Sequence, residues 1–225
     1  MKTSYEIEIK TLLGSKKNAE TLVLKMKVKD PELKNLGTHT QLNHYFETGD
    51  IKKLYENIKG YVKAEKLEIF TKLVDHVNDY SVRTRFASGK VIFVIKASVD
   101  DTTSSNGTAR MEFESQVDLS LEELDKILLD SGFKYQAKWS RERQDYKFQG
   151  MNVSIDKNAG YGYLAEFEIV SEDPSQAETL KEQLRGTMAE LGVEELNQDR
   201  LARMFDYYNK NWPDYYGTEK FFNIS

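Results

Sequence analysis

Charged side chains recur two residues apart at five places, and this spacing restricts the fold more than any other feature of the chain. In chain order the pairs are Glu6 and Glu8, Arg83 and Arg85, Glu112 and Glu114, Arg141 and Arg143, and Glu166 and Glu168. Successive side chains of a β-strand point to opposite faces, so both members of each pair share one face. The residues between the carboxylates are apolar, namely Ile7, Phe113 and Phe167. Each strand therefore has one charged and one apolar face.

A sheet with two such faces can be arranged in two ways. The ordinary arrangement places the apolar face on the core and the charged face in water, and for any single pair it is the preferred interpretation. Five pairs that alternate between acidic and basic favour a second arrangement. In it the sheet closes into a barrel whose charged faces point inward and neutralise one another, while helices cover the apolar faces outside.

The remaining sequence supplies such helices. Capping residues and apolar stripes predict helices over 15–30, 51–58, 65–77, 120–131, 174–191 and 195–209. Alternating and β-branched runs predict strands over 5–10, 41–47, 81–86, 91–96, 109–114, 135–148, 151–156 and 163–170. No linker divides the chain, so we expect one domain over 1–225, with a barrel core at 5–170 and C-terminal helices with an aromatic tail at 174–225. The helix at 65–77 in the 50–79 segment either caps one mouth of the tunnel or packs outside the barrel, and packing is the preferred interpretation.

Composition excludes several classes of function. Lys and Arg number 32 against 37 Asp and Glu, and the net charge of -5 argues against bulk attraction to nucleic acid or anionic membranes. The absence of cysteine excludes disulfides and thiolate catalysis, and three scattered histidines are too few for a histidine metal site. We find no apolar signal region or membrane-spanning run, which predicts a soluble, cytoplasmic protein.

Acidic and basic side chains in one channel have a definite chemical use. Arg and Lys bind phosphate oxygens through charge-assisted hydrogen bonds, and clustered carboxylates hold Mg²⁺ or Mn²⁺. Metal ions that bridge phosphate oxygens neutralise the charge that develops during phosphoryl transfer. The pattern therefore indicates a polyphosphate site.

The ordered motifs resemble the CYTH or triphosphate tunnel metalloenzyme superfamily, which includes class IV adenylyl cyclases, thiamine triphosphatases and inorganic tripolyphosphatases. The resemblance begins with E-x-E-x-K at Glu6, Glu8 and Lys10 and spans residues 5 to 170. It continues through Tyr45-Phe46-Glu47, Arg83 and Arg85, Lys96, Glu112 and Glu114, Arg141, Arg143 and Tyr146, Asp156, and Glu166 and Glu168.

The resemblance implies an α+β fold, a closed eight-stranded antiparallel β-barrel that forms a tunnel with a charged interior and is coated by helices. It implies phosphate contacts from Lys10, Arg83, Arg85, Lys96, Arg141 and Arg143. It implies Mg²⁺ or Mn²⁺ as the cofactor, with metal-ligand candidates Glu6, Glu8, Glu112, Glu114, Asp156, Glu166 and Glu168. The E-x-E-x-K residues Glu6, Glu8 and Lys10 are the catalytic candidates.

Three functions remain open on this pattern. The leading hypothesis is a metal-dependent phosphohydrolase acting on tripolyphosphate, thiamine triphosphate or a nucleoside triphosphate. The alternative is a class IV-type adenylyl cyclase, although the His-Phe pair typical upstream of E-x-E-x-K in those cyclases is absent. The third is a non-catalytic polyphosphate or nucleotide-binding module. The expected partner is a small-molecule triphosphate, and a homodimer is left open.

Two aromatic features have competing interpretations. The tail contains Trp212, Tyr215, Tyr216, Phe221 and Phe222. These residues either stack on a base or thiamine ring or make core or dimer contacts, and such contacts are the more common role of aromatic residues. The Gly160-Tyr161-Gly162 motif precedes no helix, so we interpret it as a hairpin turn and not as a nucleotide-binding loop.

Overall fold

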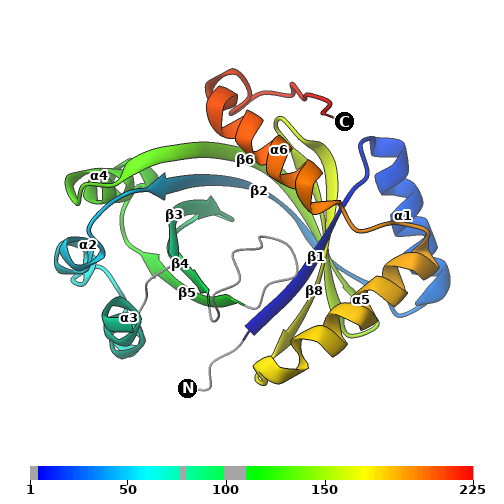
Figure 1. Cartoon of the computed structure of the whole chain (residues 1–225), viewed down its shortest axis with the longest axis horizontal. Helices are drawn as coiled ribbons and strands as arrows, with labels where there is room; N and C mark the ends of the chain where they lie inside the picture. Colours follow the sequence, from blue (N-terminus) through cyan, green and yellow to red (C-terminus); the bar gives the residue numbers. More distant parts are fainter. Residues whose placement is uncertain (1–4, 77–79, 99–109, 225) are drawn as a thin grey trace.

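One curled antiparallel sheet of eight strands forms the centre of the molecule (Figure 1). The computed structural model describes residues 5–76, 80–98 and 110–224. The strands are β1 (Tyr5–Leu12), β2 (Lys34–Glu47), β3 (Tyr80–Ala87), β4 (Lys90–Ser98), β5 (Arg110–Val117), β6 (Lys134–Phe148), β7 (Met151–Asn158) and β8 (Gly162–Ser171). Their order around the barrel is β1-β5-β4-β3-β2-β6-β7-β8. The predicted α+β class and eight-stranded antiparallel architecture are confirmed.

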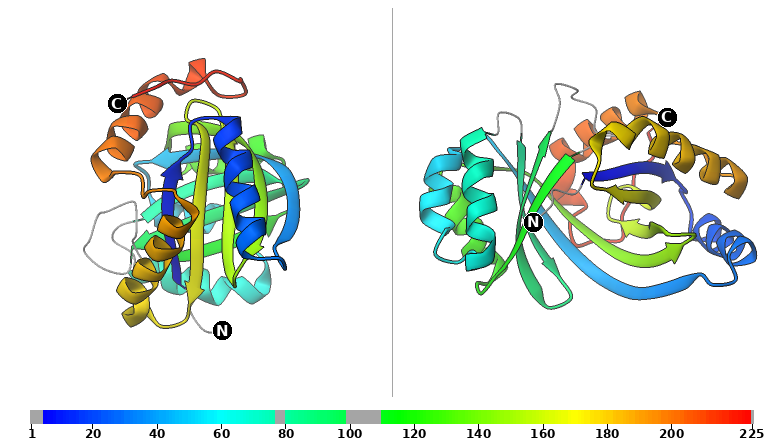
Figure 2. Two further views of the ribbon diagram at one scale, coloured as in Figure 1. Left: turned by 90° about the vertical axis from the view of Figure 1, so that its right-hand side faces the viewer. Right: turned by 90° about the horizontal axis from the view of Figure 1, so that it is seen from below.

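The barrel has one weak seam, between β1 and β5. Within the described residues, the pairs in register there are Tyr5 with Met111 and Glu6 with Arg110, whereas β1 pairs with β8 along its whole length. The expected fully closed barrel is therefore an overstatement, and the sheet is better described as strongly curled. The long strands β2 and β6 run side by side from one end of the molecule to the other (Figure 2).

Helices cover the outside of the sheet in two groups. They are α1 (Lys16–Lys29), α2 (Ile51–Ile58), α3 (Ala64–His76), α4 (Leu121–Asp130), α5 (Ala177–Leu191) and α6 (Gln198–Asn211), with short 3₁₀ turns η1 (Pro174–Gln176) and η2 (Trp212–Asp214). Helices α2, α3 and α4 lie at one end, and α1 and α5 lie at the other (Figure 1). The predicted caps are present, because the Ser15 hydroxyl accepts from the Asn18 amide and Ser120 forms a capping box with Glu123.

The apolar faces of the strands point outward and form the core with these helices. Ile7 and Ile9 on β1 and Phe167 on β8 are fully buried in one cluster with residues of α1 and α5. At the other end, Phe113 stacks on Phe70 of α3 with ring centroids 5.0 Å apart. Burial of these apolar faces is the main stabilising contribution, and it leaves the charged faces directed inward.

Two segments are of interest for the predictions made above. Phe70 of α3 contacts Phe93 of β4 and Phe113 of β5, and Leu54 and Ile58 of α2 lie in the same buried cluster, so this part of the 50–79 segment packs outside the barrel as expected. Strand β2 begins at Lys34, earlier than predicted, because its exposed first half has no apolar alternation and is held by pairing with β6. Among the described helices, none is long and apolar enough to cross a membrane.

Candidate functional site

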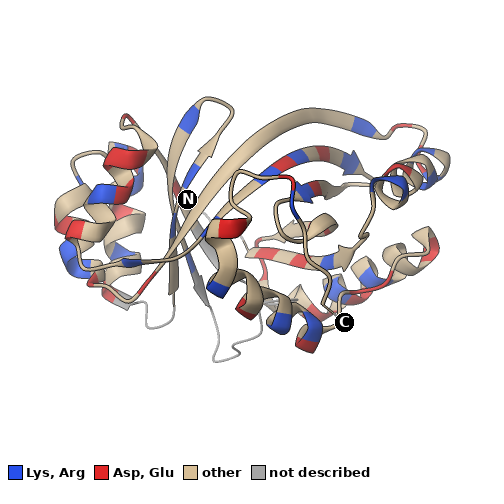
Figure 3. Cartoon of the chain, turned by 90° about the horizontal axis from the view of Figure 1, so that it is seen from above, with Lys and Arg blue, Asp and Glu red and all other residues tan. Residues whose placement is uncertain are grey.

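The barrel interior encloses a cavity of about 560 Å³. The strands bring together twelve of the thirteen predicted site residues on its wall: Glu6, Glu8, Lys10, Arg83, Arg85, Lys96, Glu114, Arg141, Arg143, Asp156, Glu166 and Glu168. Acidic and basic positions both lie on strands of the sheet (Figure 3), and the cavity-lining pair is acidic on β1 and β8 and basic on β3 and β6. The thirteenth, Glu112, pairs in register with Lys96, and its side chain lies outside the described part of the structure.

Asp156 on β7 is the most buried charged residue of this cavity. It is 0% exposed, and both of its oxygens accept from arginines of the neighbouring β6. Arg143 donates through Nε to Oδ1 at 2.7 Å and through Nη2 to Oδ2 at 2.6 Å, and Arg141 Nη1 donates to Oδ2 at 2.9 Å. Bidentate pairing of this kind fixes a guanidinium in one orientation. Asp156 therefore positions two arginines, a role that the sequence did not indicate, and its metal-ligand role stays a prediction.

Glu166 on β8 continues this network towards β1. Its Oε2 accepts from Arg143 Nη2 at 2.5 Å, and its Oε1 lies 3.6 Å from Lys10 Nζ. Burial raises the pKa of Glu166, but Arg143, Lys10 and Arg141 together lower it well below its ordinary value. Burial likewise lowers the pKa of Lys10, but Glu8 and Glu166 raise it overall. Both groups are therefore charged at neutral pH.

Strands β1, β3, β4 and β5 contribute a second set of ion pairs. Lys96 Nζ donates to Glu6 Oε2 at 2.9 Å, and Arg85 Nη1 donates to Glu114 Oε1 at 2.7 Å. Arg83 Nη1 donates to the Tyr45 hydroxyl at 2.9 Å. Burial raises the pKa of Tyr45, but Arg83 and Arg141 lower it overall. The arginines and the lysine of this wall carry the type of donor that binds phosphate oxygens through charge-assisted hydrogen bonds.

Two of the metal-ligand candidates, Glu8 and Glu168, lie on neighbouring strands, and Glu8 also accepts a hydrogen bond from Lys10 Nζ at 2.7 Å. They face each other in register on β1 and β8. Burial raises the pKa of Glu168, and although Asn152 opposes this by donating at 2.9 Å, Glu8 raises it further. Mutual repulsion of this kind is relieved by a bound cation.

The chemistry of these donors suits a hard divalent ion. Carboxylate oxygens are the protein ligands that Mg²⁺ and Mn²⁺ prefer. Within the described residues, no three acidic or histidine side chains are grouped closely enough to hold a metal ion by themselves. Mg²⁺ commonly uses one or two carboxylates together with substrate phosphates, so the residues present fit such an ion.

Several cavity residues were missed by the sequence analysis. Trp139 lies two residues before Arg141, Leu164 two before Glu166, and Asn158 two after Asp156. The same two-residue periodicity that located the charged pairs could have found these three, because they share the inward face of their strands. Tyr161 lies in the turn after β7, and Leu201, Ala202, Phe205 and Asp206 come from α6. Strand periodicity gives no signal for residues on a turn or a helix.

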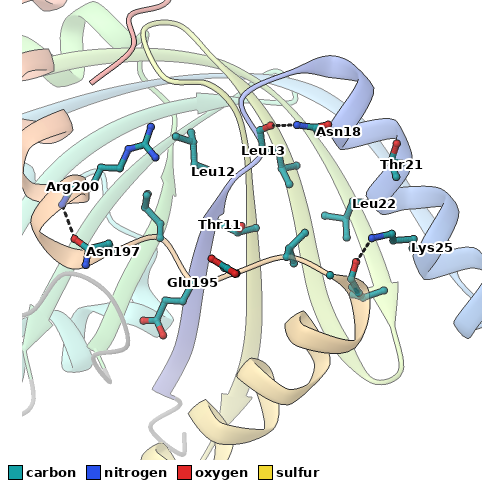
Figure 4. A pocket seen from close by; sticks show the side chains of 15 residues that line it. Thr11, Leu12, Leu13, Asn18, Thr21, Leu22, Lys25, Glu195, Asn197 and Arg200 are labelled. Atoms are coloured by element: carbon teal, nitrogen blue, oxygen red, sulfur yellow. Dashed lines mark hydrogen bonds between the residues drawn. The ribbon is translucent and has the colours of Figure 1, made fainter. Parts of the chain in front are cut away.

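A second cavity, of about 530 Å³, lies outside the barrel between β1, α1 and the segment that joins α5 to α6 (Figure 4). None of the described candidate residues lines it. Two basic side chains of this cavity donate hydrogen bonds to backbone carbonyl oxygens. Lys25 Nζ donates to the Leu191 oxygen at 2.7 Å, and Arg200 Nε donates to the Ile224 oxygen at 2.9 Å. The barrel cavity is therefore the candidate site.

Solved structures support the fold. The PH1819 protein from Pyrococcus horikoshii is similar with a TM-score of 0.61 at 20% identity, covering 86% of this chain and 94% of that chain. An adenylate cyclase candidate from Vibrio parahaemolyticus has a TM-score of 0.56 at 14% identity, with 84% and 90% covered. An adenylyl cyclase candidate from Hippeastrum, with a dominant triphosphatase activity, has a TM-score of 0.51 at 18% identity, with 90% and 96% covered.

Sequence comparison gives the family. No curated protein sequence matches this chain. The family model described as the CYTH domain matches residues 73–202, which is more than half of the chain and includes β3 to β8. That region carries the two arginine pairs and two of the three acidic pairs. The chain therefore belongs to the CYTH domain family.

Proposed function

We propose that this protein is a divalent-metal-dependent phosphohydrolase acting on a triphosphate. The observation that carries the proposal is a single barrel cavity in which Lys10, Lys96 and four arginines alternate with carboxylates. Membership of the CYTH family implies a protein that binds triphosphates and uses a divalent metal. The triphosphatase activity of the Hippeastrum protein supports hydrolysis as the reaction.

The charge balance of the cavity supports metal dependence. Among the described side chains, the barrel wall carries six bases and six acids, which are Lys10, Arg83, Arg85, Lys96, Arg141 and Arg143 against Glu6, Glu8, Glu114, Asp156, Glu166 and Glu168. A wall that is nearly neutral attracts a multiply charged anion weakly. Divalent cations bound together with the phosphates supply the missing positive charge.

The residues divide into two roles under this proposal. The lysines and arginines bind phosphate oxygens, with Arg141 and Arg143 held in orientation by Asp156. Glu8 and Glu168 are the foremost metal ligands, and Glu6, Glu112, Glu114, Asp156 and Glu166 remain candidates. When bound, the metal polarises phosphate oxygens and lowers the pKa of a water ligand. Lys10, placed between Glu8 and Glu166, stays protonated and stabilises charge on the transferred phosphate.

We also propose that residues 1–225 form one domain. Leu184, Met188 and Leu191 of α5 pack in the core beneath β1 and β8, and Leu201, Met204 and Tyr208 of α6 pack against β6 and β8. Limited proteolysis that released a stable C-terminal fragment beginning near residue 174 would contradict this proposal.

Product analysis tests the function. Purified protein is incubated with tripolyphosphate, thiamine triphosphate and ATP, each with Mg²⁺ or Mn²⁺. We expect release of orthophosphate that a chelator abolishes. Formation of cyclic AMP and pyrophosphate from ATP would instead support an adenylyl cyclase, the function for which the Vibrio and Hippeastrum structures are candidates. Triphosphate binding without either product would identify a binding module and overturn the proposal.

A further inference from the structure

The barrel cavity has a second, uncharged wall. It is lined by side chains of β6, β8, the β7–β8 turn and helix α6: Trp139, Leu164, Tyr161, Leu201, Ala202 and Phe205. We call these residues the aromatic wall. Phosphate oxygens gain nothing from apolar contacts, so a site for inorganic polyphosphate alone does not require such a wall.

We propose that the aromatic wall binds a planar ring of the substrate, so that the preferred substrate is an organic triphosphate and not inorganic tripolyphosphate. This inference rests on the proposed function, because the charged wall would bind the triphosphate portion of the same molecule. Planar rings stack on aromatic side chains, and the stacking tolerates differences between rings because each has a π-face.

The aromatic wall is fixed in position before a ligand arrives. The Trp139 indole stacks on the fully buried Tyr208 of α6, with ring centroids 3.5 Å apart and an interplanar angle of 19°. The Phe205 ring lies nearly parallel to Trp139 at 6.5 Å. Phe205 is 37% exposed although it lines the cavity. A rigid aromatic surface with an accessible ring loses little entropy when it binds a second ring.

Tyr161 adds a hydrogen-bonding group to this wall. Its side chain is 8% exposed and its hydroxyl has no hydrogen-bond partner within the described part of the protein. Burial, with contributions from Tyr208 and Tyr45, raises the pKa of Tyr161 well above its ordinary value, so the hydroxyl stays protonated. A buried hydroxyl without a partner carries a desolvation cost, which a hydrogen bond to a polar atom of the ligand would remove.

The C-terminal tail holds Tyr161 in place. The Gly160 amide donates to the Lys220 oxygen at 2.8 Å, and the Phe222 amide donates to the Gly160 oxygen at 2.8 Å. Gly160 has φ +84°, and a Cβ there would lie 2.6 Å from the Tyr208 ring. The aromatic tail residues Tyr215 and Phe222 pack around Tyr208, which favours the packing interpretation of the tail.

The rim of the aromatic wall carries an acid. Asp206, one residue after Phe205 on α6, also lines the cavity, and its carboxylate lies 3.7 Å from Lys210. An acid at this end is unsuited to phosphate and suited to a ring with hydrogen-bond donors or a positive charge. The geometry therefore points to a ligand with an anionic chain at one end and a donor-bearing or cationic ring at the other.

The test compares binding of ATP, CTP, thiamine triphosphate and tripolyphosphate by isothermal titration calorimetry, with Mg²⁺ and full-length protein. We expect at least one organic triphosphate to bind about tenfold tighter than tripolyphosphate, which is the size of a stacking contribution. We expect Phe205→Ala to remove this preference and leave the Kd for tripolyphosphate unchanged. The matched control is Phe86→Ala, because Phe86 is also 37% exposed and does not line the cavity.

A second variant isolates the hydroxyl. Tyr161→Phe keeps the ring and should weaken the preferred organic triphosphate about fivefold without changing tripolyphosphate binding. Equal affinity of wild-type protein for all four compounds would overturn the aromatic-wall proposal, as would equal losses for tripolyphosphate and organic ligand in Phe205→Ala. Either result would leave the proposed function intact. Absence of binding and turnover with every triphosphate would instead overturn both proposals.

Discussion

Two buried aspartates show how differently this protein uses a carboxylate inside and outside the barrel. Asp156 faces the cavity and is 0% exposed, and Asp125 on α4 packs against the outer surface and is 4% exposed. Charged arginines bind Asp156, and Arg143 is shared with Glu166. Uncharged hydroxyls of Thr84 and Tyr135 donate to Asp125 at 2.6 Å and 2.7 Å.

The outer network ends at a histidine that links three elements. His44 Nδ1 lies 2.6 Å from Asp125, and His44 Nε2 lies 2.8 Å from the Tyr216 hydroxyl. These bonds join α4, β2 and the C-terminal tail. The carboxylate of Asp125 is thus satisfied by fixed neighbours, whereas the arginines at Asp156 have donors that a phosphate can use. We expect Asp156 to govern function and Asp125 to govern stability.

The largest expected effect is that of Asp156→Asn on catalysis. The variant keeps the shape of the side chain but removes the charge that orients Arg141 and Arg143. We expect kcat/KM for the triphosphate to fall about 100-fold, because the two arginines lose a buried charge partner. Steady-state kinetics measures this. A near-normal kcat/KM would contradict this prediction, because Asp156 would then contribute to stability, as Asp125 does, and not to catalysis.

Asp125→Asn should act on stability instead. The amide cannot accept all the bonds that Asp125 now accepts, and its NH₂ group is directed at donors. We expect a loss of about 2 kcal/mol in the free energy of unfolding and a fall of about 5 °C in Tm. Thermal denaturation measures the loss, and kcat/KM of the folded fraction serves as the control. A large fall in kcat/KM with unchanged Tm would reverse the assigned roles.

Within the cavity, Glu8→Gln and Arg85→Ala separate metal binding from phosphate binding. We expect Glu8→Gln to raise the metal concentration needed for half-maximal turnover about tenfold, because a neutral amide binds a divalent cation weakly. Arg85→Ala should raise KM for the triphosphate by a similar factor at saturating metal. Titrations of metal and of substrate distinguish the two. Full activity of either variant at limiting metal and substrate would contradict its assigned role.

The smallest expected effect is the pH dependence of the Asp125 contribution. Burial raises the pKa of Asp125, but hydrogen bonds from His44, Thr84 and Tyr135 lower it overall. Since the folded-state pKa is below the unfolded value of about 4, the stabilisation is complete above that pH and is lost as pH falls through the folded-state pKa. The stability difference between wild type and Asp125→Asn should therefore shrink below about pH 4. Urea denaturation at several pH values measures it, and a constant difference would contradict the lowered pKa.

The inward and outward faces of the barrel could be predicted because strand geometry is local. A side chain two residues from Arg141 must share its face, whatever the rest of the fold does, and this places Arg143 and also Trp139. The same rule separates Tyr45, which faces the cavity, from its neighbour His44, which faces α4. Helix caps such as Ser15 and Ser120 could be predicted for the same reason, because each cap bonds to a residue only three positions further along the chain.

Residues that meet only through tertiary packing could not be predicted. Phe205 and Asp206 reach the cavity because α6 packs across β6, and α6 gives no sign of this in its own apolar stripe. Tyr161 was recognised as part of a hairpin turn, yet its contact with the cavity depends on the tail that holds Gly160. The early start of β2 likewise depends on β6, whose pairing stabilises a polar segment.

The sequence by itself determined which side chains share a face, and with it the charged interior and the family resemblance. Backbone geometry imposes this periodicity on every strand, so no knowledge of distant contacts is required. Only the tertiary structure decided that β1 and β5 meet along a short seam, that Asp156 orients two arginines, and that α6 adds an aromatic wall. These features join residues far apart in the chain, and their arrangement depends on how whole elements pack together.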